Sequence, residues 1–121
     1  MTDILSRLRR AQAASAAIAQ LPDADRAAII LEMADHVEHS VSTLVQENKR
    51  DLERMDTNDP KYDRLMLTES RITSIAHDMR SVAHLPSPLG IVLEEKSLTN
   101  GIAMKKISVP MGVIGIIYEA R

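Results

Sequence analysis

The chain has 121 residues, of which 45% are apolar and only 2% are aromatic, with two Tyr and no Phe or Trp. Its net charge of -2 provides no clustered basic face, and the missing aromatic rings remove the stacking platforms that nucleic-acid bases use, so we expect no nucleic-acid partner. The absence of cysteine excludes disulfides, thiolate metal sites and a cysteine nucleophile within these residues.

The N-terminal residues from Met1 to Ile4 begin a charged amphipathic pattern. A secretory signal would instead combine a basic start with a continuous apolar core. No apolar stretch approaches the roughly 18 residues that a membrane-spanning helix needs. The sequence therefore predicts a cytoplasmic protein without a membrane partner.

The first half of the chain carries apolar residues at intervals of three or four, which is typical of amphipathic helices. A first helix is expected from Thr2, a capping residue, to Leu21, and Pro22 ends it. A second helix begins at Asp23, a good N-cap residue, and continues over roughly 28 residues to the neighbourhood of Leu52. Its apolar stripe consists of Ala27, Ile30, Ala34, Val37, Val41 and Leu44.

Short polar residues and a proline over 56–60 predict a turn, which is followed by a short helix around 62–66. Thr68 caps the next helix, which ends at the two prolines and the glycine of segment 85–90. We expect the buried stripe of this helix to consist of Ile72, Ile75, Met79 and Val82.

After Gly90 the pattern becomes strand-like. Residues 91–99 and 102–109 predict two antiparallel strands joined by a two-residue Asn100-Gly101 turn, because this pair readily adopts the positive φ angles that such a turn requires. A two-stranded ribbon alone is only marginally stable in water. We therefore expect this ribbon to pack against another surface.

The last segment, residues 110–121, predicts a strand that is buried on both faces. Val113 to Tyr118 is a nearly unbroken apolar run, whereas a strand with one solvated face alternates apolar and polar residues. A parallel neighbour needs a crossover of about a dozen residues, so we expect the partner strands to come from another molecule or from sequence beyond Arg121. The two glycines in this segment lie within the run rather than between a strand and a helix, unlike a dinucleotide-binding loop.

Two clusters of polar residues on the expected helices are candidate binding sites. Glu32, His36 and His39 lie on one face of the second helix and could supply metal ligands, but the Glu-x-x-His pairs of di-iron bundles do not occur. Three arginines on the first helix could bind phosphate or a partner, but Asp3 lies one turn before the first of them. These arginines are Arg7, Arg9 and Arg10. We expect solvated helix faces in both cases, with no metal site and no self-contained catalytic centre.

Segment 109–121 reads Val-Pro-Met-Gly-Val-Ile-Gly-Ile-Ile-Tyr-Glu-Ala-Arg. It is similar to the gamma-glutamyl phosphate reductase family, also called glutamate-5-semialdehyde dehydrogenase, which typically reads Val-Pro-Leu-Gly-Val-Ile-Gly, an apolar residue and then Ile-Tyr-Glu-x-Arg-Pro-Asn. Met111 in place of Leu is the one change. Further features agree with the family in order along the chain: Asn48 with Asp51, Asp63-Arg64-Leu65, Leu67-Thr68, Arg71-Ile72, the Leu85 to Gly90 segment and Asn100-Gly101.

The resemblance implies the α/β fold of the aldehyde dehydrogenase superfamily, with a nucleotide-binding domain, a catalytic domain that carries a cysteine, and a β-ribbon that makes homo-oligomers. It implies an NADPH-dependent reduction of L-glutamyl 5-phosphate to L-glutamate 5-semialdehyde, with release of phosphate, in proline biosynthesis. A cysteine thiolate would hold the acyl group while hydride is transferred. Since this chain has no cysteine, that nucleophile would lie outside it.

Under this resemblance the chain is the N-terminal part of an enzyme some three times longer. Residues 1–90 are then helices that pack on the nucleotide-binding domain, residues 91–109 are the root of the oligomerisation ribbon, and residues 110–121 are the incomplete first strand of that domain. The alternative is a free-standing helical interaction or assembly module without catalysis, which would use the ribbon and the apolar strand as contact surfaces.

The resemblance places the functional residues of this chain at its end. It implies that Tyr118, Glu119 and Ala120 lie near the nicotinamide half of the cofactor. Arg121 stands where many members of the superfamily have an asparagine that stabilises the oxyanion. A guanidinium at that position can bind an acyl phosphate or the substrate carboxylate bidentately, whereas the alternative for Arg121 is a frayed chain end without a role.

Overall fold

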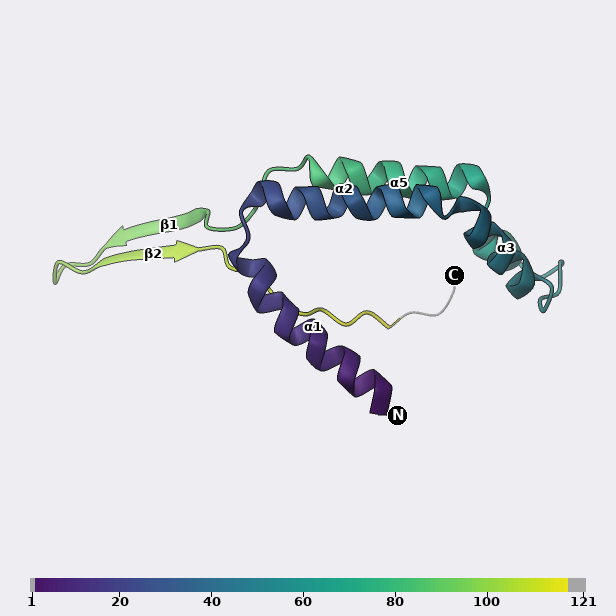
Figure 1. The fold of residues 1–121 in the computed structure, drawn as a ribbon. Coiled ribbons are helices and arrows are strands. Elements are labelled where there is room, and N and C mark those ends of the chain that lie inside the picture. The colour runs from purple at the N-terminus through teal and green to yellow at the C-terminus, as the bar shows by residue number, and fades with distance from the viewer. Residues whose placement is uncertain (1, 118–121) are drawn as a thin grey trace. The chain divides into compact units, whose positions relative to one another are not determined.

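The computed structural model describes residues 2–117, and the side chain of Thr2 is not described. These residues contain five helices and two strands in the order α1–α2–α3–α4–α5–β1–β2 (Figure 1). They form two compact units. The ribbon unit consists of residues 2–23 and 86–115, and the helical unit consists of residues 24–85 and 116–117.

In the ribbon unit, helix α1 spans Thr2–Gln20, as predicted, and Pro22 separates it from α2. Its apolar side chains remain largely exposed: Ile4, Leu5, Leu8 and Ile18. The apolar face that the sequence predicts is therefore present but has no covering partner among the described residues. No helix within residues 2–117 is both long enough and apolar enough to span a bilayer.

The long second helix is interrupted, which corrects the prediction of one continuous helix. Helix α2 spans Asp23–His39 and α3 spans Val41–Leu52. Between them Ser40 has φ -93° and ψ 6°, away from the helical ψ near -42°. Serine is a weak helix former, because its hydroxyl competes for backbone groups. Figure 1 shows that α3 leaves the direction of α2.

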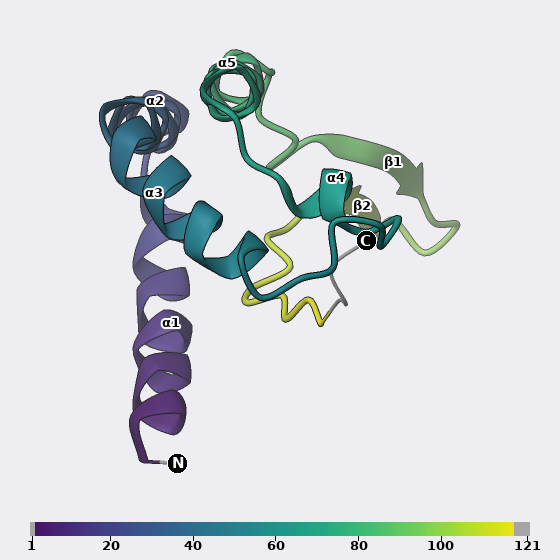
Figure 2. The ribbon, with the colours of Figure 1, turned by 90° about the vertical axis from the view of Figure 1, so that its right-hand side faces the viewer.

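The remaining helices of this unit are α4, Tyr62–Leu65, and α5, Glu69–Ala83. The Thr68 side chain accepts a hydrogen bond from the backbone N–H of Arg71 at 3.2 Å, which confirms the predicted cap. Helices α2 and α5 run side by side and antiparallel, and Figure 2 views the pair end on.

The buried residues of the described chain all belong to the helical unit: Ala34, Leu52, Ile72 and Ala76. The stripe predicted for α5 is partly wrong, because Ile75 and Val82 are exposed, whereas Ala76 is fully buried. The two fully buried alanines lie one on α2 and one on α5. This core is small and depends on few side chains.

In the ribbon unit, β1 spans Val92–Ser97 and pairs antiparallel with β2, Ala103–Ile107, as predicted. The turn is different from the prediction. Gly101 has φ 84°, and no other described residue of the loop has a positive φ. Leu98 N–H donates to Ile102 O at 2.8 Å and Gly101 N–H donates to Leu98 O at 2.9 Å. These bonds enclose a three-residue loop in which only the glycine adopts the left-handed conformation.

Both faces of the ribbon are exposed. Its cross-strand pairing includes a salt bridge between Lys105 and Glu95 at 3.1 Å, and a bulge lies between Val92 and Glu94. The expectation that the ribbon packs on another surface stays a prediction.

The predicted buried strand is not formed over residues 110–117, which have no regular secondary structure. Gly112 has φ 84°, and Ile116 and Ile117 are among the most exposed apolar residues. A strand that is buried on both faces needs a neighbour on each side. Apart from β1 and β2, the part of the chain that the structure describes provides no strand for it to join.

Candidate functional site

The residues that the sequence singles out for function, Tyr118, Glu119, Ala120 and Arg121, lie outside the described residues. Their predicted roles in cofactor and substrate binding therefore stay predictions. The segment that leads to them is apolar and open, since Ile114 and Ile116 are exposed. The polar clusters of α1 and α2 and the motif residues upstream lie within the described residues.

The acidic and imidazole side chains of α2 are solvated. Glu32 Oε1 lies 3.9 Å from His36 Nε2, and both side chains are more than three-quarters exposed. His39 Nδ1 lies 2.6 Å from Asp35 O, one turn back on the same helix. Within residues 2–117, no group of three or more potential metal ligands comes together.

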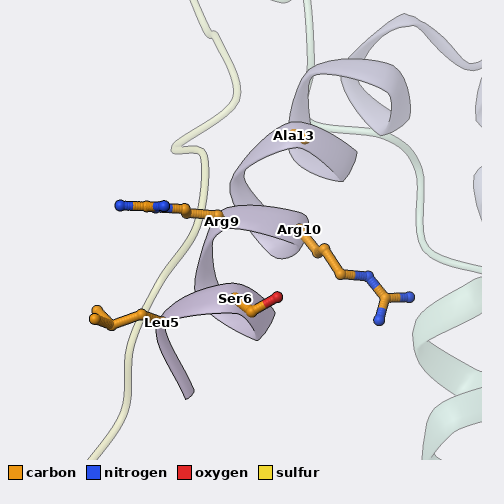
Figure 3. Close-up of a pocket in the computed structure, with 5 residues that line it drawn as sticks. All are labelled: Leu5, Ser6, Arg9, Arg10 and Ala13. Atoms are coloured by element: carbon orange, nitrogen blue, oxygen red, sulfur yellow. The ribbon is translucent and has the colours of Figure 1, made fainter. Parts of the chain in front are cut away.

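The arginines of α1 do not converge. Arg7 pairs with Asp3 at 2.8 Å, as their spacing predicts. Arg9 and Arg10 line a shallow hollow together with Leu5, Ser6 and Ala13. Figure 3 shows the two guanidinium groups pointing to opposite sides of the helix. A single phosphate could not be held by both groups, so this hollow is not a candidate anion site.

Asn48 is one of the motif residues, and its role in the structure is to connect two elements. It projects from α3, where its Nδ2 donates to Leu65 O at 2.8 Å and its Oδ1 accepts from Leu67 N–H at 2.7 Å. The amide side chain thus satisfies both a donor and an acceptor of the chain between α4 and α5, in a partly buried setting. It fixes that connection to α3.

Arg71 secures the same connection from α5. Its guanidinium donates to the carbonyl oxygens of Asp63 and Met66, the latter at 2.7 Å. It also reaches the Asp63 carboxylate at 3.1 and 3.2 Å. Arginine suits this position because its planar fork presents several donors at once. The motif residues Asn48, Asp63 and Arg71 therefore all hold the chain between α4 and α5 by hydrogen bonds, and periodicity in the sequence does not reveal these bonds.

Arg80 links the two long helices of the unit. Its Nη2 lies 2.6 Å from Asp35 Oδ1 and 2.5 Å from Glu38 Oε2, both on α2. Hydrogen bonds to Asp35 and then Glu38 raise the pKa of Arg80 above its ordinary value. A raised pKa favours the charged form in the fold, so this contribution is present at neutral pH and is lost only in strongly alkaline solution.

Another motif segment, residues 85–90, forms the root of the ribbon. The hydroxyl of Ser108 donates to Pro88 O and accepts from Ile91 N–H, the latter at 3.0 Å. Gly90 N–H donates to Ser108 O at 3.0 Å, with Gly90 at φ 75°. The prolines and the glycine therefore bring the two ends of the ribbon together.

The described residues thus comprise helices and an antiparallel ribbon, and no catalytic constellation is assembled among them. No family model matches the chain. Curated proteins do match it, and their names confirm the resemblance seen in segment 109–121.

The chain is similar to gamma-glutamyl phosphate reductases over nearly its whole length. It is 51% identical to that of Chlorobaculum parvum over 118 residues, which is 98% of this chain and 28% of the relative. It is 47% identical to that of Chlorobium phaeobacteroides over 118 residues, with the same shares. It is 49% identical to that of Legionella pneumophila strain Lens over 121 residues, which is 99% of this chain and 29% of the relative.

The chain therefore spans less than a third of the length of the curated relatives it matches. These relatives are named as reductases, which favours the resemblance over the alternative of a free-standing assembly module.

Proposed function

We propose that this chain is the N-terminal segment of a gamma-glutamyl phosphate reductase that converts L-glutamyl 5-phosphate to L-glutamate 5-semialdehyde with NADPH and releases phosphate. The observation that carries this proposal is the 45–51% identity to reductases over 98% or more of the chain. The activity belongs to the proline-biosynthetic enzyme as a whole, a cytoplasmic homo-oligomer with the aldehyde dehydrogenase fold.

The described residues do not form a cofactor site by themselves. They contain no glycine-rich loop between a strand and a helix, and the hollow on α1 is lined by one helix only. NADPH, which would supply the hydride, is therefore assigned to the remainder of the enzyme, with a contribution from Tyr118, Glu119 and Ala120. The nucleophilic cysteine also comes from that remainder, since this chain has none.

The test is a chimera in which this chain replaces the matching 121 residues of the Legionella pneumophila reductase. We expect the chimera to reduce NADP⁺ with L-glutamate 5-semialdehyde in a reaction that requires phosphate, measured by NADPH absorbance. The chain alone should show neither this activity nor saturable NADPH binding. A soluble, folded chimera without activity would contradict the proposal, as would tight NADPH binding by the chain alone.

Arg121 is proposed to bind the acyl phosphate or the carboxylate of the substrate. In the chimera, Arg121→Ala should lower kcat/KM by about 10- to 100-fold, because a charge-assisted bidentate contact is lost. Arg121→Lys should recover only part of this loss, since an ammonium group cannot form the planar fork. The control Arg9→Ala, on α1, should change kcat/KM by less than about twofold. Equal kinetics for Arg121→Ala and Arg9→Ala would exclude this role.

A further inference from the structure

The pair of helices α2 and α5 has two unlike faces. One face carries the ion pairs of Arg80 with Asp35 and Glu38. Other positions of the two helices expose large apolar side chains. These are Ile29 at 42% and Met33 at 53% on α2, and Ile75 at 45% and Val82 at 53% on α5. None of these four side chains carries a charge.

Helix geometry places these four residues on the side away from the ion pairs. Met33 and Ile75 each immediately precede the fully buried Ala34 and Ala76, so each is turned about 100° from the buried alanine of its own helix, in the same sense. In an antiparallel pair, such positions on the two helices lie on the same side. Ile29 and Val82 lie one or two turns from Met33 and Ile75, on the same helix faces.

The positions of the ion-paired residues agree with this geometry. Asp35 immediately follows Ala34, and Glu38 and Arg80 each lie one turn after a buried alanine, so all three are turned in the opposite sense. The salt bridges of Arg80 with Asp35 and Glu38 show that positions turned in one sense meet across the pair. Ile29, Met33, Ile75 and Val82 therefore define an apolar face on one side of the helical unit. By their helix positions, Arg26 and Arg71 lie on the same side.

We infer that this apolar face is the surface on which the remainder of the reductase packs, and that the ion-paired face stays in solvent. This inference depends on the function proposed above. Less than a third of the relatives' length matches this chain, so most of the protein that could cover the face lies outside it. Four large uncharged side chains on one side favour an apolar partner, because burying the carboxylates and the guanidinium group of the ion pairs on the other side would carry a desolvation cost.

The first test measures directly whether the apolar face is covered, and it does not depend on enzyme activity. Met33 should be oxidised by hydrogen peroxide about tenfold more slowly in the chimera with the Legionella pneumophila reductase than in the chain alone, as measured by mass spectrometry, because oxidation follows exposure. Equal rates would overturn the inference whether or not the chimera is active. Protection of Met33 in the chain alone, together with a dimer in solution, would assign the face to a second copy instead.

The second test places a charge on each side of the pair. In the chimera, Met33→Glu and Val82→Glu should each reduce the yield of soluble enzyme at least about tenfold, because they introduce a carboxylate into the inferred contact. The matched controls Ala28→Glu and Ser74→Glu, at exposed positions on the other sides of α2 and α5, should leave the yield within about twofold.

The two failures are distinguishable in this design. If the parent chimera is active and Met33→Glu and Val82→Glu behave like their controls, the packing inference is wrong and the proposed function stands. If the parent chimera is soluble and inactive, the proposed function fails, and the oxidation rate of Met33 still decides whether the face is covered.

Discussion

Replacing Ile72 by alanine is expected to lower the free energy of unfolding of the helical unit by about 2–4 kcal/mol. Among the described residues, Ile72 is the largest side chain that is fully buried, with 1% of its surface exposed. Its removal leaves a cavity in a core that otherwise consists of two alanines and Leu52. A unit of this size has a net stability of only a few kcal/mol, so a large part of the population should unfold.

The measurement is urea unfolding followed by far-ultraviolet circular dichroism, which reports on the helices of this unit. Ile75→Ala is the matched control, since Ile75 lies on the same helix and is 45% exposed. It should cost less than about 1 kcal/mol, because little apolar surface is withdrawn from water there. If the two variants lost equal stability, the buried side of α5 would be the one that periodicity predicts and not the one in the structure.

Ile72 and Ile75 also show how far the sequence determines the helices. The caps and breaks at Thr68 and Pro22 are local signals, and both are confirmed. The side of α5 that is buried is a property of the helical unit, because it depends on which neighbouring helices approach it. A stripe that includes both Ile72 and Ala76 differs by a small rotation from one centred on Ile75, and the spacing alone does not distinguish them.

The break at Ser40 and the hairpin loop were missed for a related reason. Apolar spacing continues across Ser40, and its N–H still bonds to the helix before it, at 3.1 Å to His36 O. The pattern therefore contains no signal for the change of direction. Asn100-Gly101 does mark the turn, but a three-residue loop needs a positive φ only at Gly101, so the dipeptide is compatible with both loop lengths.

The prediction for residues 110–117 failed for a different reason. A buried strand requires adjacent strands, and the described residues place none beside this segment. An apolar run such as Val113 to Ile117 specifies burial, but hydrogen bonds from adjacent strands are what make it a strand. The described residues leave this segment exposed and without regular structure. Sequence similarity relates the run to the reductases, whereas its strand pairing depends on the partner strands.

Asn48→Ala is expected to lower the free energy of unfolding of the helical unit by about 2–3 kcal/mol. The substitution removes both hydrogen bonds of the amide and leaves Leu65 O and Leu67 N–H without their partner. Because the site is only partly buried, water can replace some of the lost bonding, which limits the cost.

Two further variants separate this bonding role from the change in helix propensity at position 48. Asn48→Asp keeps the acceptor for Leu67 N–H and loses the donor to Leu65 O, so its loss of stability should be smaller than that of alanine if the Leu67 bond dominates. Lys49→Ala, at the next, exposed position of α3, should change stability by less than about 0.5 kcal/mol. Urea unfolding of the three variants gives the comparison. Since alanine is the best helix former, a stabilised Asn48→Ala would mean that the network contributes nothing and that the agreement of this residue with the family has a cause other than the fold.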